Sequence, residues 1–284
     1  MVQFIAEVSS NHHANLERCL RFIDMAASVG CDAIKFQLFR IEQLFAPEIL
    51  VRSAEHRKRK QWELPETFLP KLAERCSMNK IQFACTPFYL EAVSQLQPYV
   101  NFYKVASYEL LWDDLLVACA RTGKPVFLST GMASLPEIEH AVSVLRLHGC
   151  MTPFLFHCTS AYPTPPHEAN LAAIETLRQA HHCPVGWSDH TVTPAVVHRA
   201  VHRWGAQGIE FHLDLDGQGE EYELGHCWLP ERIGAVIKDV RQAHSVDGNG
   251  IKEPVASERA DQDWRADPSD GLRPLKHLRS KWCS

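Results

Sequence analysis

The sequence of 284 residues lacks any apolar run that reaches the roughly 18 residues of a membrane span. It has no excess of basic charge either, since 34 acidic side chains outnumber 29 lysines and arginines. The resulting net charge of −5 argues against a general nucleic-acid surface. No Cys-x-x-Cys pair occurs among the ten cysteines. We therefore expect a protein with no membrane and no nucleic-acid partner.

The first expected strand begins at Gln3, which leaves no room for a signal peptide. Most of the cysteines lie within apolar segments, a pattern typical of small buried thiols in a reducing cytoplasm. This interpretation fits Cys19, Cys31, Cys85, Cys119 and Cys158 best. A cysteine nucleophile is conceivable only at Cys85 or Cys158, beside polar strand ends. We expect a cytoplasmic protein with free thiols.

Eight short apolar runs each end in polar residues whose side chains could take part in catalysis or ligand binding. A helical pattern usually follows each run. The expected strands cover residues 4–8, 33–37, 82–85, 102–105, 126–129, 154–157, 185–188 and 208–211. Strands that alternate with helices indicate βαβ units in a parallel sheet. Eight such units in about 250 residues match the closed (β/α)8 TIM barrel, an α/β fold whose active site lies at the carboxyl ends of its strands. The pattern therefore predicts an enzyme.

Helix signals and a change of composition set the expected boundaries. Leu16, Leu20, Ile23 and Ala27 recur at helical spacing, and Ser134 with Glu137 forms a capping-box pattern. Helices are also expected over residues 66–78 and 230–243. We predict one barrel domain over residues 1–244. Residues 245–284, richer in polar residues, glycine and proline, are expected to form a C-terminal tail.

The long connection at residues 38–65 is a candidate substrate loop, because connections of this length are usually functional or disordered. It carries the basic run at residues 56–60. That run is either a solvated face or a lid that brings positive charge to an anionic substrate.

His190 and His212 are the strongest candidate metal ligands. They follow the seventh and eighth strands, which are neighbours about 4.8 Å apart in a parallel barrel. Two imidazoles at that separation can share one divalent cation and leave positions open for water and substrate. Either histidine alone would be more typical of a satisfied polar residue. His12, His13, His157 and His226 are weaker candidates.

Lys35 and Lys104 each lie inside an apolar strand, where an unpaired ammonium group would be costly. At a barrel mouth such lysines suit a Schiff base or a clamp for phosphate or carboxylate. The alternative is an internal ion pair with Glu7 or Glu109.

Hydroxyl groups follow two other strands, at residues 129–131 and at Ser188. Strand-to-helix turns of this kind hold phosphate well, although each serine alone would be an ordinary helix cap. Together with the two lysines, they suggest a small substrate that carries both phosphate and carboxylate.

Seven short sequence motifs occur in order along the chain, most of them at the expected strand ends. They are EVSSNH at 7–12, IKFQ at 34–37, CTPF at 85–88, YKVASYE at 103–109, LSTGMA at 128–133, HCTSAYPT at 157–164 and GWSDHT at 186–191. Over roughly residues 3–243 the chain resembles the barrel of the sialic acid synthase (N-acetylneuraminate synthase, NeuB-like) family.

That resemblance implies condensation of phosphoenolpyruvate with an aldose such as N-acetylmannosamine. The products would be a sialic-acid-like 2-keto-3-deoxy sugar acid and phosphate. The resemblance also implies a divalent metal, Mn²⁺ or else Mg²⁺ or Co²⁺, and a homodimer. Carried over by motif, the substrate-binding residues are Lys35, Thr86, Lys104, Ser107, Ser129, Ser160, Tyr162 and Ser188. Glu109 would be the acid/base residue, with Glu7 and Lys104 as further catalytic groups. His190 and His212 would hold the metal.

The chain departs from the family pattern in three places. Glu210-Phe211-His212 stands where the family usually has Glu-Lys-His, and residues 214–221 replace a Gly-Pro-Asp-His region. The chain also stops about where a C-terminal antifreeze-like domain, which gives the partner subunit an arginine for the sugar, would begin. Trp264 and Leu272 of the tail are costly to leave in water. We hypothesise that Arg265 or Arg273 lines the sugar site, in cis or in trans.

Two other functions remain possible on the sequence. One is a metal-dependent aldolase or isomerase that does not use phosphoenolpyruvate. The other is a catalytically degenerate barrel that acts as a binding subunit, against which the retained lysine and histidine set argues. Phosphate release separates the synthase from the aldolase, and binding of Mn²⁺ or phosphoenolpyruvate separates both from the degenerate barrel.

Overall fold

Eight parallel strands close into a barrel in the computed structural model, which describes residues 2–282. Neighbouring strands pair in sequence order, and β1 also pairs with β8 to close the ring. The strands are β1 (Gln3–Glu7), β2 (Ala33–Leu38), β3 (Gln82–Pro87), β4 (Phe102–Val105), β5 (Val126–Ser129), β6 (Phe154–His157), β7 (Val185–Asp189) and β8 (Gly208–Leu213). The predicted (β/α)8 TIM barrel is confirmed.

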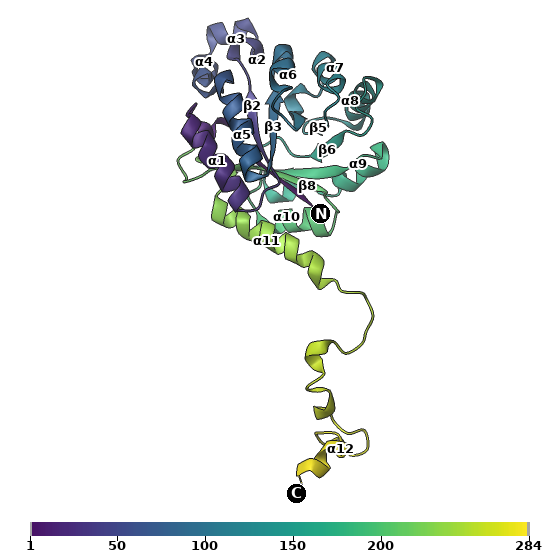
Figure 1. Cartoon of the computed structure of the whole chain (residues 1–284). Helices are drawn as coiled ribbons and strands as arrows, with labels where there is room; N and C mark the ends of the chain where they lie inside the picture. The colour runs from purple at the N-terminus through teal and green to yellow at the C-terminus, as the bar shows by residue number, and fades with distance from the viewer. Residues whose placement is uncertain (1, 283–284) are drawn as a thin grey trace. The chain divides into compact units, whose positions relative to one another are not determined.

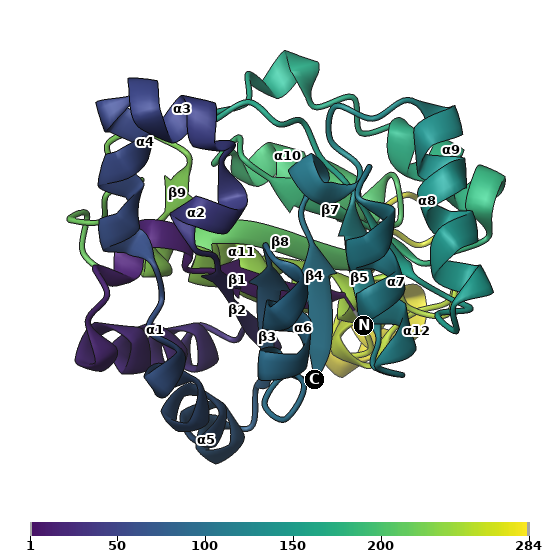
Figure 2. The same ribbon diagram turned by 90° about the horizontal axis from the view of Figure 1, so that it is seen from above.

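Helices surround this ring, as Figure 2 shows from above. They are α1 (Leu16–Ser28), α5 (Leu69–Asn79), α6 (Leu90–Leu96), α7 (Asp113–Arg121), α8 (Leu135–Leu147), α9 (Ala173–His181), α10 (Pro194–His202) and α11 (Pro230–Val246). Each longer helix turns an apolar stripe to the strands; α1, for example, buries Phe22 and Ile23. The predicted capping box begins α8, where the Glu137 carboxylate accepts the Ser134 N–H at 2.7 Å.

The connection after β2 is folded rather than a plain loop (Figure 1). It contains α2 (Ile41–Leu44), α3 (Pro47–Arg52) and α4 (Ala54–Lys58), followed by a 3-10 turn at Arg59–Trp62. The basic run lies on α4 and this turn, and most of its side chains are exposed. The Lys60 ammonium contacts the Glu42 carboxylate at 2.6 Å.

Four of the expected strand ends were too early, those of β2 and β7 by one residue and those of β3 and β8 by two. Strand β3 continues to Pro87, and β8 continues to Leu213, so His212 lies inside β8. A short ninth strand, β9 (Cys227–Trp228), pairs in parallel with β8 and was not predicted. A strand of this length carries too little alternation to be recognised in a sequence.

The centre of the barrel is an apolar layer of inward-facing side chains. Its members are Ile5, Ala33, Ala84, Phe102, Phe127 and Phe156. The Phe102 and Phe127 rings stack with their centroids 4.1 Å apart. A glycine is required at position 186, because a Cβ atom there would approach the Gly208 carbonyl oxygen to 2.5 Å and the Phe156 ring to 2.7 Å.

A buried carboxylate ties β7 to β9. Asp189 accepts the indole N–H of Trp187 at 3.0 Å and that of Trp228 at 2.9 Å, and the Thr191 hydroxyl at 2.7 Å. The side chain of Asp189 is fully buried. Because these acceptor contacts hold the turn that carries His190, the carboxylate supports the site above it.

Replacement of Asp189 by Asn should lower the free energy of unfolding by about 3 kcal/mol, since an amide nitrogen cannot accept the indole N–H that faces it. Urea denaturation measures this loss. Asp113→Asn, at an exposed carboxylate, should change it little. A loss below about 1 kcal/mol for Asp189→Asn would contradict this account of the turn.

The chain divides after Gln242 into two compact units. The second unit is not simply extended: it contains 3-10 turns at Ala256–Glu258 and Gln262–Trp264 and the short helix α12 (Lys276–Arg279). Asp267 accepts the backbone N–H groups of Ser269 at 3.0 Å and Lys276 at 2.8 Å. Docking of this segment near the active site stays a prediction.

The cysteines in the described part of the chain agree with the expectation of free thiols. The nine cysteines there are free and buried. Burial raises the pKa of Cys19 to about 12, and it also raises the pKa of Cys85, so both thiols stay protonated near neutral pH. Among residues 2–282, no helix combines the length and the apolar character that a membrane crossing requires.

Candidate active site

A polar layer lies one step above the apolar centre of the barrel. Side chains two residues apart on a strand share a face, so each inward apolar position is followed by another inward position toward the carboxyl end. The polar side chains at these next positions are Glu7, Lys35, Thr86, Lys104, Ser129, Ser188 and Glu210, with His212 one step further on β8. The barrel thus gathers most of the predicted site residues at one end.

Lys35 is held by two carboxylates and a hydroxyl. Its ammonium forms an ion pair with Glu7, donates to the Thr86 hydroxyl at 3.2 Å and lies 3.9 Å from Glu210. Burial acts to lower the pKa of Lys35, but the charges of Glu210 and Glu7 outweigh it and raise the pKa. The ion pair with Glu7, the alternative left open by the sequence, is therefore present, and Lys35 is a permanent cation.

Lys104 has a different setting. Its ammonium donates to the Ser129 hydroxyl at 2.5 Å and lies 3.6 Å from the Glu210 carboxylate. The acidic partner of Lys104 among the described residues is thus Glu210, and the ion pair that the alternative named is the one between Lys35 and Glu7. Burial lowers the pKa of Lys104, opposed by Glu210.

Glu210 is the central acceptor of this layer and was not chosen from the sequence as a site residue. It contacts both lysines and accepts the Ser188 hydroxyl at 3.3 Å. The sequence did contain the information needed to include Glu210. Glu210 and His212 are two residues apart on one strand, so their side chains must share a face.

Ser107, Ser160 and Gly131 form a second polar corner. The Ser107 hydroxyl accepts the Gly131 N–H at 3.0 Å, and the buried Ser160 hydroxyl has no hydrogen-bond partner in the described structure. A Cβ atom at Gly131 would lie 2.2 Å from the Ser160 hydroxyl and 2.9 Å from that of Ser107. The absence of a side chain at Gly131 therefore lets the Ser107 and Ser160 hydroxyls lie close to this residue.

Gly131→Ala should accordingly weaken substrate binding without unfolding the barrel, because the methyl group pushes both serine side chains out of place. We expect KM for the anionic substrate to rise about tenfold or more. Steady-state kinetics gives this value, with Gly234→Ala on α11 as a control, where the new methyl group would meet only the Val29 side chain at 3.4 Å. An unchanged KM would show that the two hydroxyls do not act on the substrate.

Glu109 ends a 3-10 turn, Ser107–Glu109, directly after β4. The side chain is buried, and its Oε2 atom has no hydrogen-bond partner among the described residues. Burial is the main reason that the pKa of Glu109 is raised to about 7. A carboxyl group with this pKa can both take up and release a proton at neutral pH, as an acid/base catalyst must.

The predicted pair of imidazoles is brought together. The rings of His190 and His212 lie with their centroids 5.4 Å apart. His190 Nδ1 lies 2.9 Å from the Thr159 carbonyl oxygen, and His212 Nδ1 lies 2.8 Å from Glu221 Oε2. An acceptor on one ring nitrogen leaves the other nitrogen as a ligand atom, which is the usual arrangement of metal-binding histidines.

The electrostatics of this pair also suit a cation. Burial, helped by the nearby His212, lowers the pKa of His190 to about 3, so the ring is neutral at pH 7. Burial would lower the pKa of His212 as well, but the Glu221 carboxylate raises it instead. The Tyr162 ring packs beside that of His190, with the two ring centroids 4.3 Å apart.

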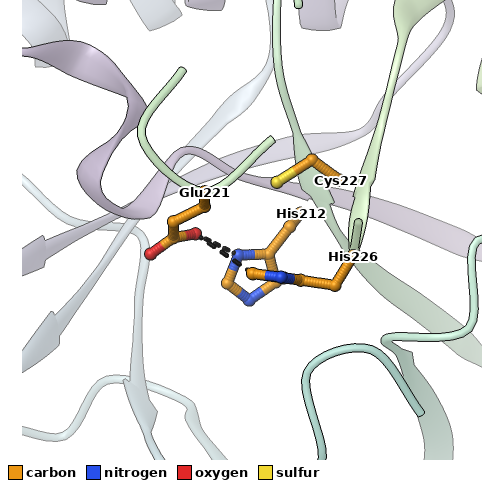
Figure 3. Close-up of side chains that lie close together, drawn as sticks. All are labelled: His212, Glu221, His226 and Cys227. Atoms are coloured by element: carbon orange, nitrogen blue, oxygen red, sulfur yellow. Dashed lines mark hydrogen bonds and ion pairs between the residues drawn. The ribbon is translucent and has the colours of Figure 1, made fainter. Parts of the chain in front are cut away.

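Two neighbours of His212 were missed or ranked too low in the sequence. Glu221, in the segment that departs from the family pattern, was not considered, and His226 was only a weak candidate. With Cys227 they form a group whose ligand atoms all lie within 4.8 Å of one another (Figure 3). They come from a connection without regular periodicity, so no spacing rule could place them. Arg265 and Arg273 belong to the second unit, and their relation to this site stays a prediction.

A closed ring of eight βα units, with buried lysines, hydroxyls and imidazoles at the carboxyl ends of its strands, defines a TIM-barrel enzyme. The site offers cationic groups for an anion, one carboxyl group tuned for proton transfer and a set of nitrogen and oxygen ligands that fits a divalent metal.

Comparison with known proteins agrees with this class. The sequence profile of the NeuB family matches residues 22–252, and the chain belongs to the NeuB family. An uncharacterized protein of Methanocaldococcus jannaschii is 37% identical over 90% of this chain and 74% of its own length. The N,N'-diacetyllegionaminic acid synthase of Campylobacter jejuni is 33% identical over 90% of this chain and 80% of its own.

A solved structure is also closely similar. The N-acetylneuraminic acid synthetase of Leptospira borgpetersenii superposes with a TM-score of 0.80 at 33% identity, covering 95% of this chain and 93% of that one. The Campylobacter and Leptospira relatives are named as a synthase and a synthetase, and this chain is an enzyme of the same synthase type.

Proposed function

We propose that the enzyme condenses phosphoenolpyruvate with an aldose related to N-acetylmannosamine, giving a sialic-acid-like 2-keto-3-deoxy sugar acid and phosphate. The observation that carries this proposal is the polar layer of the barrel, where two buried lysines and several hydroxyls lie beside a pair of imidazoles. The names of the synthase relatives support the same class of reaction.

The lysines and hydroxyls suit a substrate with both phosphate and carboxylate groups. Lys35 with Thr86 and Lys104 with Ser129 are two cation–hydroxyl pairs, each within hydrogen-bond distance. In the free enzyme their charge is balanced by Glu7 and Glu210, so the cradle is organised before substrate binds. Ser107, Ser160, Tyr162 and Ser188 complete the proposed cradle.

The proposed reaction forms one carbon–carbon bond. C3 of phosphoenolpyruvate attacks the aldehyde carbon of the sugar, whose oxygen takes up a proton from solvent water. The cation left at C2 adds water, and Glu109 accepts a proton from that water. Phosphate then leaves with the former enol oxygen and takes the proton of the new C2 hydroxyl group, so that the C2 ketone remains. Lys104 and Glu7 are proposed to stabilise charge beside the reacting carbons, which makes a Schiff base unnecessary.

The donor set fits a divalent cation, most simply Mn²⁺, with Mg²⁺ or Co²⁺ as alternatives. His190 and His212 would hold it, because each ring has one nitrogen on an oxygen acceptor and the other available. When bound, the ion would polarise the sugar aldehyde as a Lewis acid.

We also propose that the tail contributes to sugar recognition through Arg265 or Arg273, and that the enzyme is a cytoplasmic homodimer. A chain ending at Gly250 should then raise KM for the sugar about tenfold or more and leave KM for phosphoenolpyruvate unchanged. Kinetics of the truncated chain, with Arg265→Gln and Arg273→Gln as matched single variants, measures this effect. Unchanged sugar kinetics would rule the contribution out, and sedimentation analysis tests the dimer.

The function is tested by a screen for phosphoenolpyruvate-dependent phosphate release over a panel of aldoses with Mn²⁺. We expect release only when both an aldose and phosphoenolpyruvate are present. Turnover of pyruvate and an aldose without phosphate release would instead identify an aldolase. Failure of calorimetry to detect binding of either phosphoenolpyruvate or Mn²⁺ would identify a degenerate barrel that acts as a binding subunit.

A further inference from the structure

The connection from β8 to β9 returns two possible metal ligands to His212. Glu221 Oε2 lies 2.8 Å from His212 Nδ1 and 3.4 Å from His226 Nε2. The rings of His212 and His226 lie with their centroids 4.8 Å apart. Figure 3 shows the Glu221 carboxylate and both imidazoles converging, with the Cys227 thiol beside them.

This connection is held firmly in place. Asn11 accepts the Glu221 N–H at 2.9 Å and donates to the Leu213 carbonyl at 3.0 Å. Asp214 accepts the Gly219 N–H at 3.2 Å and is paired with Arg18 at 3.0 Å. The position of the partly buried Glu221 carboxylate is therefore set by a preorganised loop, as a ligand position should be.

The nitrogen of His226 that faces Glu221 is Nε2, and it is the atom that can share an ion with this carboxylate. The His226 side chain is only 3% exposed, and its Nδ1 atom is buried without a hydrogen-bond partner among the described residues. Imidazole nitrogens combined with a carboxylate oxygen suit divalent transition metals, whereas Mg²⁺ prefers all-oxygen sites.

We propose that Glu221 and His226 join His212 as direct protein ligands of a divalent transition-metal ion. This inference rests on the metal of the proposed function and gives that ion an alternative ligand set, in which His212 binds through Nδ1, the nitrogen that faces Glu221, and His190 is not a ligand. The carboxylate neutralises one charge of the ion inside the barrel, and a set of two imidazoles and one carboxylate leaves coordination positions for substrate. The same set selects Mn²⁺ and Co²⁺ over Mg²⁺.

The test is metal binding by the full chain after removal of metal with a chelator. Isothermal titration calorimetry with Mn²⁺, Co²⁺ and Mg²⁺ should rank Mg²⁺ weakest. Glu221→Gln and His226→Gln should each weaken Mn²⁺ binding at least about tenfold. Glu220→Gln and His167→Gln, which remove an exposed carboxylate and an exposed imidazole, should leave it unchanged. Circular dichroism in chelator checks that each variant folds.

Pulsed electron paramagnetic resonance of the Mn²⁺ complex distinguishes a ligand from a residue that acts through another. The ¹⁴N couplings should correspond to one imidazole fewer in His226→Gln than in the unaltered chain. Unchanged couplings in that variant, or unchanged affinity in both variants, would overturn the assignment, and a variant that fails to fold is replaced by Glu221→Asp or His226→Asn.

The outcomes separate this inference from the proposed function. If His190→Ala loses Mn²⁺ while Glu221→Gln and His226→Gln retain it, the added ligands are wrong and the function stands. If the two variants lose Mn²⁺ but the unaltered chain releases no phosphate with any aldose, the ligand set is right and the function is wrong.

Discussion

His212→Ala should reduce phosphate release in the presence of an aldose by about 10³-fold or more while the barrel stays folded. The reason is positional. His212 lies inside β8. Its ring centroid is 5.4 Å from that of His190, and its Nδ1 atom is within hydrogen-bond distance of Glu221. The substitution therefore removes the imidazole that both proposed ligand sets share. Steady-state phosphate-release kinetics at saturating Mn²⁺ measures the effect.

The fold should not depend on this ring, because His212 points into the polar mouth and not into the apolar layer below it. The far-ultraviolet circular dichroism and the urea midpoint of His212→Ala should therefore stay close to those of the unaltered chain. His167→Ala serves as the control at an exposed imidazole. Full activity in His212→Ala would contradict the proposed role of a metal ion in the reaction.

Glu109→Gln should reduce kcat by about 10²- to 10⁴-fold, the usual contribution of a positioned acid/base group. The pH profile gives the sharper test. Burial raises the pKa of Glu109 to about 7, and the proposed step needs the ionised carboxylate as base. The rate of the unaltered enzyme should thus increase as the pH rises through about 7, and this limb should vanish in the glutamine variant.

The control for this profile is Glu220→Gln, which removes a carboxylate exposed to solvent and should leave the limb in place. If Glu109→Gln keeps both its rate and the limb near pH 7, another group titrates and Glu109 is not the base. If the limb falls with rising pH instead, Glu109 acts in its protonated form.

The barrel was predictable because it is a repetition of local rules. Period-two strands and helices with an apolar stripe recur eight times, and the polar positions follow the apolar ones at fixed spacing. The same rule placed Lys35 and Lys104 at the mouth. It also placed His190 and His212 together, since adjacent strands fix their separation.

The rest depended on contacts between segments that no local pattern describes. Glu210 is central only because two lysines from other strands reach it. Glu221 and His226 come from an irregular connection whose path is set by Asn11, far away in sequence. Such tertiary contacts are decided by side-chain hydrogen bonds and loop closure, which leave no periodic trace.

The most direct test of the proposed condensation is the product formed from phosphoenolpyruvate labelled with ¹³C at C3. In the presence of N-acetylmannosamine and Mn²⁺, nuclear magnetic resonance should show the labelled carbon as a methylene group bonded to the former aldehyde carbon, in amounts equal to the phosphate released. Label found only in the methyl group of pyruvate would contradict the account, because it would mean hydrolysis of phosphoenolpyruvate without formation of a carbon–carbon bond.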